Sequence, residues 1–198
     1  MKVTLIDMNT KGVKTMISAL GICRGNDCTE DTLKKALEAK PVPHMSVLEF
    51  GWVCLKVEGV SVKTRIQLVR HRLFSTMERS TRSINMEQAK CIIPKTAINT
   101  YIYDSYTLAL DDYSTALYEG LTPEDASYLL PMGVETEFFL AGNMRTWFEY
   151  FEKRLCKKHV QDEHYRLAME MYKLIKDKFP MISQAVPCKA CGKCGEKE

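Results

Sequence analysis

The chain has 198 residues, of which 45% are hydrophobic and 27% are charged, and its formal net charge is +3. This composition excludes a disordered chain, and the length fits one domain with a sizeable core. The charge is too small to indicate binding to nucleic acid, and no apolar run is long enough to span a membrane. Because residues 1–7 contain no hydrophobic signal segment, we expect a cytoplasmic protein.

Hydrophobic spacing, helix caps and chain breakers predict the elements in chain order. In the first half we expect a strand at 3–7, a helix from 29 to 37, a buried strand at 47–57, a helix at 62–72 and a loop at 75–83. In the second half we expect a short strand at 91–94, a long helix at 98–117, a short helix after Thr122, a strand at 135–140, and helices at 143–156 and 161–178. This mixture of strands and helices indicates an α+β domain over residues 1–186.

A dense cluster of hydrogen-bond donors lies between Arg70 and Arg82. Four arginines, His71, Glu78 and four hydroxyl side chains occupy these thirteen positions. Arginine binds phosphate or carbonyl oxygens with two parallel hydrogen bonds, and hydroxyls and loop amides add donors for the same anions. The cluster therefore predicts a pocket for a nucleotide, although a solvated basic surface is the alternative that the charges alone leave open.

A second informative segment is the predicted helix at 143–156. Asn143, Trp147, Tyr150 and Arg154 lie on one stripe of this helix, as expected for a face that contacts a long ligand. Asn143 alone is most simply a helix N-cap, and Trp147 and Tyr150 are more simply core residues than a platform for a cofactor. Arg154 differs from an ordinary surface arginine only because it lies on the same stripe as Asn143.

Eight cysteines are spread along the chain, and three of them lie close together in the last twelve residues. Without a predicted export signal, free thiols or a metal site are favoured over disulfides. Cys188, Cys191 and Cys194 form two overlapping Cys-x-x-Cys units, but three thiolates are one short of a tetrahedral site. We therefore treat residues 187–198 as a separate tail, with these cysteines as weak metal candidates only.

The cluster at 70–82 resembles the signature of the flavin-dependent thymidylate synthases, the ThyX family. That signature has Arg-His-Arg, followed by Ser, Asn, Ser, Arg and Tyr at fixed spacing, and this chain matches it at Arg70-His71-Arg72, Ser75, Ser80 and Arg82. Pro43–Glu49, Leu129–Pro131 and Asn143–Arg145 are similar to further family segments. The resemblance implies a ThyX-like α+β fold with a mixed or antiparallel sheet, packed helices and active sites at the subunit interfaces of a homotetramer.

The resemblance also implies roles for individual residues. The residues expected to bind flavin adenine dinucleotide (FAD) are Ser46, Arg70, His71, Arg72, Glu78, Asn143 and Arg145. The residues expected to bind deoxyuridine monophosphate (dUMP) are Gln67, Arg70, Glu78, Arg79, Ser80, Thr81, Arg82 and Arg154, with main-chain donors from Arg79 and Thr81. Arg154 is the expected catalytic residue, because an arginine at the O2/N3 edge of uracil stabilises negative charge and makes C5 a better nucleophile.

For such an enzyme the resemblance implies conversion of dUMP to deoxythymidine monophosphate (dTMP). Methylenetetrahydrofolate would supply the carbon and NADPH the reducing equivalents, with neither nucleic acid nor membrane as a partner. The chain departs from the family pattern at Met77, Ser83, Ser127 and Glu149. These departures leave open a related activity that makes a hydroxymethyl pyrimidine nucleotide, and a more distant alternative is a non-catalytic nucleic-acid-binding module.

Overall fold

The computed structural model describes residues 1–39, 44–98 and 100–179. The predicted tail at 187–198, with Cys188, Cys191 and Cys194, lies outside these residues. Strands occur at β1 (Lys2–Met8), β2 (Trp52–Ser61), β3 (Ser75–Glu78) and β4 (Glu135–Asn143). Helices occur at α1 (Gly12–Arg24), α2 (Glu30–Glu38), α3 (Val62–Leu68), α4 (Tyr101–Tyr118), α5 (Pro123–Ala126), α6 (Met144–Arg154) and α7 (Asp162–Lys178). Short 3-10 helices lie at Met45–Phe50 (η1), Lys95–Ala97 (η2) and Ser127–Leu129 (η3).

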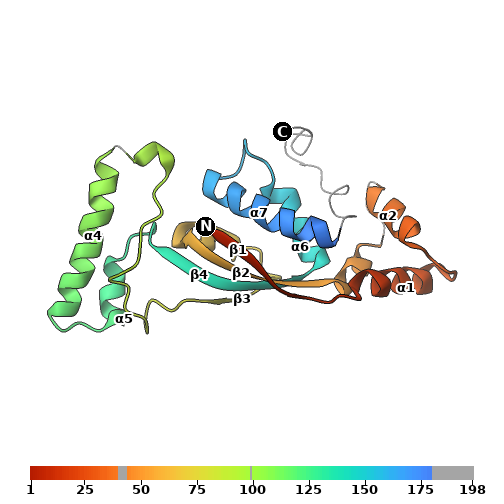
Figure 1. Cartoon of the computed structure of the whole chain (residues 1–198), viewed down its shortest axis with the longest axis horizontal. Coiled ribbons are helices and arrows are strands. Elements are labelled where there is room, and N and C mark those ends of the chain that lie inside the picture. Colours follow the sequence, from red (N-terminus) through yellow and green to blue (C-terminus); the bar gives the residue numbers. More distant parts are fainter. Residues whose placement is uncertain (40–43, 99, 180–198) are drawn as a thin grey trace. The chain divides into compact units, whose positions relative to one another are not determined.

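The described residues form a four-stranded sheet in the order β1-β2-β4-β3 (Figure 1). This sheet, together with the helices, makes the α+β class that the sequence predicts. The chain divides into two compact units. Unit 1 comprises Met1–Lys2, Val57–Arg70 and Thr76–Phe139, and unit 2 comprises Val3–Lys56, His71–Ser75 and the described residues from Leu140 onward.

Unit 1 has its own hydrophobic core beneath α4 and α5. Met86, Tyr113, Ala116, Ala126 and Val134 are buried together in it. The Tyr113 hydroxyl accepts a hydrogen bond from the Met86 N–H at 3.1 Å, which satisfies the one polar atom of that ring in the core. Helix α4 packs on α5 and η3, and these helices lie side by side in Figure 1.

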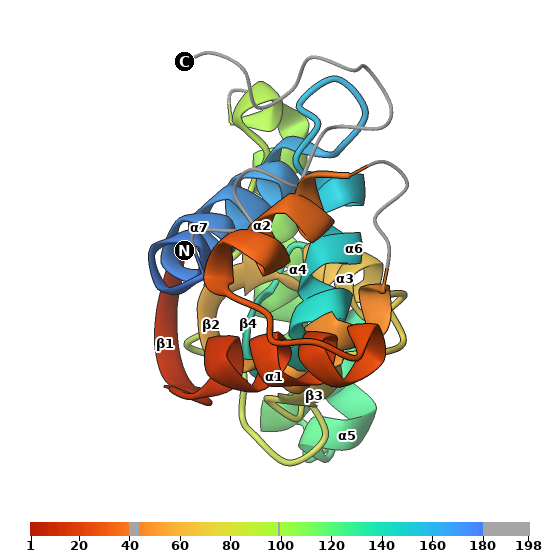
Figure 2. The same cartoon turned by 90° about the vertical axis from the view of Figure 1, so that its right-hand side faces the viewer.

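Unit 2 is built around the aromatic face of α6. Trp147, Tyr150 and Phe151 are completely buried and make edge or stacked ring contacts with one another. Phe74 joins them, with its ring centroid 4.6 Å from that of Trp147. At Gly142 an added Cβ would lie only 2.7 Å from the Phe74 ring, so a glycine there permits this close packing. Helix α7 packs on α6, and α1 contacts α2, as Figure 2 shows.

Several local predictions were wrong. The short strand predicted at 91–94 does not form, and Cys91 makes only an isolated antiparallel bridge to Val134. The strand predicted at 47–57 begins at Trp52, and the preceding residues form η1. Val47 and Leu48 are both buried within η1, and a short continuous apolar run does not distinguish a buried strand from a helical turn. The helix predicted at 62–72 ends at Leu68, so the Arg70-His71-Arg72 triplet follows the helix. The segment predicted as a loop at 75–83 begins with β3, the strand next to β4 at one edge of the sheet.

Candidate functional site

Helix α6 starts at Asn143, which is the N-cap. The Asn143 Oδ1 accepts hydrogen bonds from the Thr146 N–H and the Thr146 hydroxyl, both at 3.0 Å. The cap satisfies a main-chain donor that would otherwise lack a partner at the helix start. It therefore fixes the direction in which the first turn of α6, with Arg145, leaves the sheet.

Arg145 is held by two carboxylates within unit 2. Its Nη1 donates to Glu49 Oε1 at 2.8 Å, and its Nε donates to Glu149 Oε1 at 3.2 Å. The hydrogen bond to Glu49, followed by that to Glu149, raises the pKa of Arg145. Glu149, one of the departures from the family pattern, is thus an ion-pair partner of a predicted flavin-binding residue. Ser46 lies on η1, exposed to solvent.

At the other end of α6, Arg154 donates from Nε to His71 Nε2 at 3.0 Å. A protonated imidazole has no lone pair to accept this bond, so His71 is neutral and carries its proton on Nδ1. Burial, with the charges of Arg154 and Lys153, lowers the pKa of His71 to about 4. The structure therefore brings together the predicted catalytic arginine and the central residue of the Arg-His-Arg triplet.

Behind this pair lies a buried polar contact. The His71 ring meets the edge of Tyr150 with ring centroids 4.9 Å apart, and the Tyr150 hydroxyl and His164 Nε2 are 3.1 Å apart. Both Tyr150 and His164 have no exposed surface. Burial, together with the charge of Arg154 and the proximity of His71, lowers the pKa of His164 to about 3, so this imidazole is also neutral. Trp147 and Tyr150 are core residues, as their helical spacing favours.

Most of the residues predicted to bind dUMP lie in unit 1, and several are already paired. Glu78 forms an ion pair with Arg65 of α3. Arg79 forms an ion pair with Glu137 of β4, and its N–H donates to the Glu137 carbonyl at 3.0 Å. The main-chain donor that we predicted at Arg79 for the nucleotide is therefore engaged within the chain. Gln67 is half-buried on α3, and Arg70 follows this helix and is exposed.

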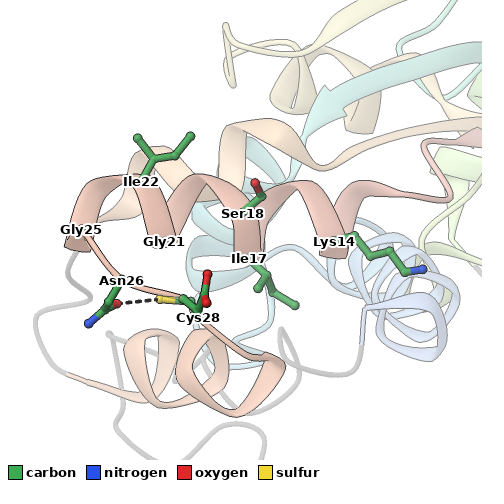
Figure 3. A pocket seen from close by; sticks show the side chains of 9 residues that line it. Lys14, Ile17, Ser18, Gly21, Ile22, Gly25, Asn26 and Cys28 are labelled. Atoms are coloured by element: carbon green, nitrogen blue, oxygen red, sulfur yellow. Dashed lines mark hydrogen bonds between the residues drawn. The ribbon is translucent and has the colours of Figure 1, made fainter.

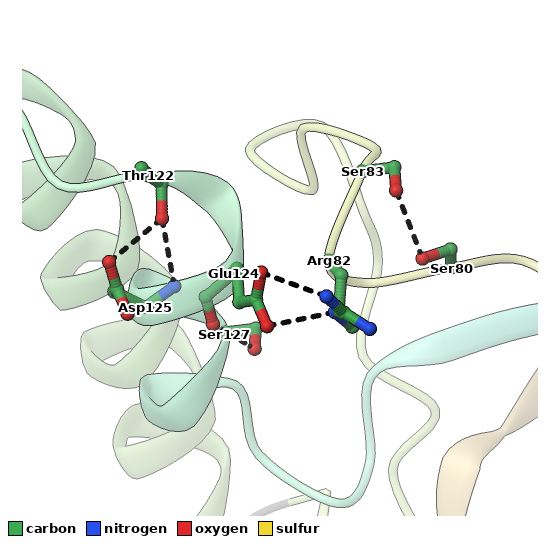
Figure 4. A network of polar contacts seen from close by, with 7 residues as sticks. All are labelled: Ser80, Arg82, Ser83, Thr122, Glu124, Asp125 and Ser127. Carbon is green, nitrogen blue, oxygen red and sulfur yellow. Dashed lines mark hydrogen bonds and ion pairs between the residues drawn. The ribbon is translucent and has the colours of Figure 1, made fainter.

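Arg82 forms the most solvent-exposed of these ion pairs. Its Nε lies 2.9 Å from Glu124 Oε1 and its Nη2 lies 3.1 Å from Glu124 Oε2 (Figure 4). Glu124 stands in the first turn of α5, which Thr122 caps by accepting from the Asp125 N–H at 3.2 Å. The hydroxyl of Ser127, another departure from the family pattern, donates to the Glu124 carbonyl at 2.7 Å. Ser80 and Ser83 lie close by in the sequence, and their hydroxyls are 3.4 Å apart.

The predicted site residues thus divide between the two units. Unit 1 contains the residues Gln67, Arg70, Glu78, Arg79, Ser80, Thr81 and Arg82. Unit 2 contains the residues Ser46, His71, Arg72, Asn143, Arg145 and Arg154. Each unit supplies cationic and hydroxyl donors, the chemistry that phosphate and carbonyl oxygens require.

A cavity of about 720 Å³ lies elsewhere, beside the turn between α1 and α2 (Figure 3). Lys14, Ser18, Asn26 and Cys28 are among the residues that line it, and the Cys28 thiol lies 3.6 Å from Asn26 Oδ1. None of the predicted site residues lines this cavity. Within the described part of the chain, no group of His, Cys, Asp and Glu side chains is arranged to hold a metal ion.

Comparison with known proteins decides the family. Residues 4–181 match the model of the thymidylate synthase complementing proteins. The chain is 30% identical over 194 residues to the flavin-dependent thymidylate synthase of Saccharolobus solfataricus. That alignment covers 91% of this chain and 74% of the relative. It is 32% identical over 161 residues to the flavin-dependent thymidylate synthase of Geobacter sulfurreducens. That alignment covers 77% of this chain and 69% of the relative.

This chain belongs to the flavin-dependent thymidylate synthase family. The fold agrees: the crystal structure of thymidylate synthase X from Helicobacter pylori with FAD and dUMP superposes with a TM-score of 0.77 over 92% of this chain and 97% of that one, at 17% identity. The resemblance stated from the Arg-His-Arg signature is confirmed, and so is the ThyX-like α+β fold. No helix among the described residues combines the length and apolar character that crossing a membrane requires.

Proposed function

We propose that this member of the ThyX family converts dUMP to dTMP with FAD as cofactor, NADPH as reductant and methylenetetrahydrofolate as the one-carbon donor. The observation that carries the proposal is the family match over residues 4–181, which includes the whole Arg70–Arg82 cluster and Arg154. The 30% identity to a flavin-dependent thymidylate synthase over 91% of the chain supports the same activity.

The residues of unit 2 fit a flavin dinucleotide. Arg72 is exposed and can form two parallel hydrogen bonds to a diphosphate, and Ser46 offers an exposed hydroxyl. Arg145 is compensated by two carboxylates, so its role is better suited to a neutral carbonyl edge of the ring system than to a phosphate. We assign FAD to these three residues with His71 and Asn143. The family resemblance implies Arg70 and Glu78 as further flavin contacts.

The nucleotide site is assigned to unit 1. We assign the phosphate to Arg82 and Ser80, and the remaining polar atoms of dUMP to Gln67 and Arg70. Because the Arg79 and Glu78 side chains have partners in Glu137 and Arg65, we assign them the support of this site as well as the nucleotide contact that the family implies. The Thr81 N–H completes the proposed set.

Arg154 carries the proposed chemistry. Its Nε donates to neutral His71, which orients the guanidinium group, and we assign this group to the O2/N3 edge of uracil. A fixed positive charge there stabilises the negative charge that develops as C5 attacks the one-carbon unit. FAD, when bound and reduced, supplies the hydride that completes the methyl group. The protein orients three flat ligands and keeps them in contact.

We further propose that the enzyme is a homotetramer with active sites built by several subunits. Unit 1 exposes large hydrophobic side chains on α4 and η3, including Tyr101 at 79%, Leu108 at 61%, Tyr118 at 93% and Tyr128 at 90% exposure. Exposed apolar groups of this kind are typical of surfaces that another chain covers.

A single-turnover assay tests the proposed activity. The purified protein should bind FAD, which its absorption spectrum shows, and should convert dUMP to dTMP when NADPH and methylenetetrahydrofolate are added. Mass spectrometry of the nucleotide separates the outcomes: a methyl product supports the proposal, and a hydroxymethyl product supports the related activity that Met77, Ser127 and Glu149 leave open. A colourless protein that binds no added FAD would contradict both.

A further inference from the structure

The ion pair between Arg82 and Glu124 has the geometry of an arginine bound to a phosphate. Two nitrogens of one guanidinium group face two oxygens of one anion, at 2.9 and 3.1 Å. Carboxylates and phosphates both bind a guanidinium group through two oxygens. A phosphate monoester offers such a pair of oxygens with a larger negative charge than a carboxylate.

Glu124 is held in place for this contact. It lies in the first turn of α5, between the Thr122 cap and Ser127, whose hydroxyl donates to the Glu124 carbonyl. Figure 4 shows the carboxylate pointing from this turn toward Arg82. The backbone at Glu124 is thus fixed by hydrogen bonds, and the long side chain can turn away without disturbing the helix.

The pair is also easy to exchange. The side chains of Arg82 and Glu124 are 71% and 52% exposed, and an ion pair in water is weak because solvent screens both charges. A dianionic phosphate can therefore displace the carboxylate, but it must replace an existing partner of Arg82 to do so. A ligand without a phosphate leaves the pair intact.

We propose that the Glu124 carboxylate and the 5′-phosphate of the nucleotide compete for the guanidinium group of Arg82. Glu124 then sets how much the 5′-phosphate contributes to substrate affinity. This inference rests on the proposed function, in which Arg82 binds the phosphate of dUMP. It predicts that removing the carboxylate charge strengthens the binding of a nucleoside monophosphate. The binding of the corresponding nucleoside stays the same.

Isothermal titration of the full-length, FAD-loaded protein with dUMP and with deoxyuridine tests the proposal. Glu124→Gln should bind dUMP roughly 1.5- to fivefold more tightly than the unmodified protein, the range expected for removing one exposed ion-pair partner of an arginine. Its affinity for deoxyuridine should be unchanged. Glu119→Gln is the matched control, because it removes an exposed carboxylate of the same unit beside α4 and should alter neither affinity.

Unchanged or weaker binding of dUMP to Glu124→Gln overturns the proposal, and weaker binding would show instead that Glu124 orients Arg82 for the phosphate. Glu124→Ala is the second variant, and it must also tighten dUMP binding if competition is the cause. If the unmodified protein binds dUMP no better than deoxyuridine, the assignment of the phosphate to Arg82 fails first, and the inference fails with it. That outcome is visible before any variant is made.

Discussion

Arg154 and His71 form the contact on which the proposed chemistry depends most. The bond from Arg154 Nε to His71 Nε2 is possible only while His71 is neutral, and burial and the adjacent guanidinium charge keep it so. Each residue thereby supports the other: the imidazole orients the arginine, and the arginine disfavours protonation of the imidazole.

Replacement of Arg154 by alanine should reduce turnover by about two to three orders of magnitude, as for the loss of a donor that stabilises developing charge. FAD binding should persist, because Arg154 is assigned to the substrate. Without the guanidinium charge, the pKa of His71 should also rise from about 4 toward 6.5, which NMR titration measures. Arg166→Ala on α7, an exposed arginine paired with Asp162, is the control. Unchanged turnover in Arg154→Ala would reject the role of this residue.

The buried His164 predicts how stability depends on pH. Its pKa is about 3 in the folded chain and 6.5 when exposed, so the unfolded chain binds the proton first as the pH falls. The contribution of neutral His164 to the free energy of unfolding is fully present above pH 6.5 and decreases as the pH falls toward 3. By pH 4 the free energy of unfolding has fallen by up to about 3 kcal/mol.

Urea unfolding between pH 7 and about pH 4 measures this dependence, and His164→Gln should make the curve shallower because glutamine does not titrate. His159→Gln, which changes an exposed histidine, should leave the slope unaltered. Equal slopes for His164→Gln and the unmodified protein would be incompatible with a neutral, buried His164.

Among the helices, α6 is the element that links the fold to the proposed flavin site, since its cap Asn143 is also a predicted FAD contact. Asn143→Ala should lower the free energy of unfolding by roughly 1 kcal/mol through loss of the cap, and should also weaken FAD binding. Asn143→Ser keeps a capping oxygen and should restore stability without restoring the amide contact. Equal FAD affinity in both variants and the unmodified protein would remove Asn143 from the flavin site.

The elements that were predicted correctly carry their signals locally. Thr29 forms a capping box with Thr32 at the start of α2, and Thr122 followed by a proline begins α5. Helix α1 carries no such signal: its N-cap position, Lys11, makes no side-chain cap hydrogen bond, and we made no prediction for it. Strand β3 was missed because it forms by pairing with a distant strand, which no local pattern of Ser75–Glu78 indicates.

The same holds for the site: a local motif predicts the cationic residues, and their ion-pair partners lie far away in the sequence. The family resemblance indicates the cations directly, but not these partners, because Glu49 lies 96 residues from Arg145 and Glu137 lies 58 residues from Arg79. Glu124, 42 residues from Arg82, could be found only once the chain was folded. Ion pairs between distant residues depend on the fold, so the sequence predicts which donors exist and not which are already engaged.

For the molecule as a whole, the family match ends at residue 181, before the cysteine-rich tail. Deletion of residues 187–198 should therefore leave FAD binding and turnover within about twofold of the full-length protein. Absorption spectra and single-turnover rates check this. A deletion variant that fails to fold, together with zinc in the full-length protein by mass spectrometry, would instead assign Cys188, Cys191 and Cys194 to a structural metal site.

The positions of the two tryptophans affect how the protein can be followed in solution. Trp52 is 39% exposed and Trp147 is fully buried, and both belong to unit 2. Intrinsic tryptophan fluorescence therefore reports on the unit that carries the proposed flavin residues, and it gives no direct signal from unit 1. Far-UV circular dichroism reports on the helices of both units, including α4 and α5 of unit 1. A fluorescence melting curve and one recorded by circular dichroism would therefore coincide only if both units unfold together.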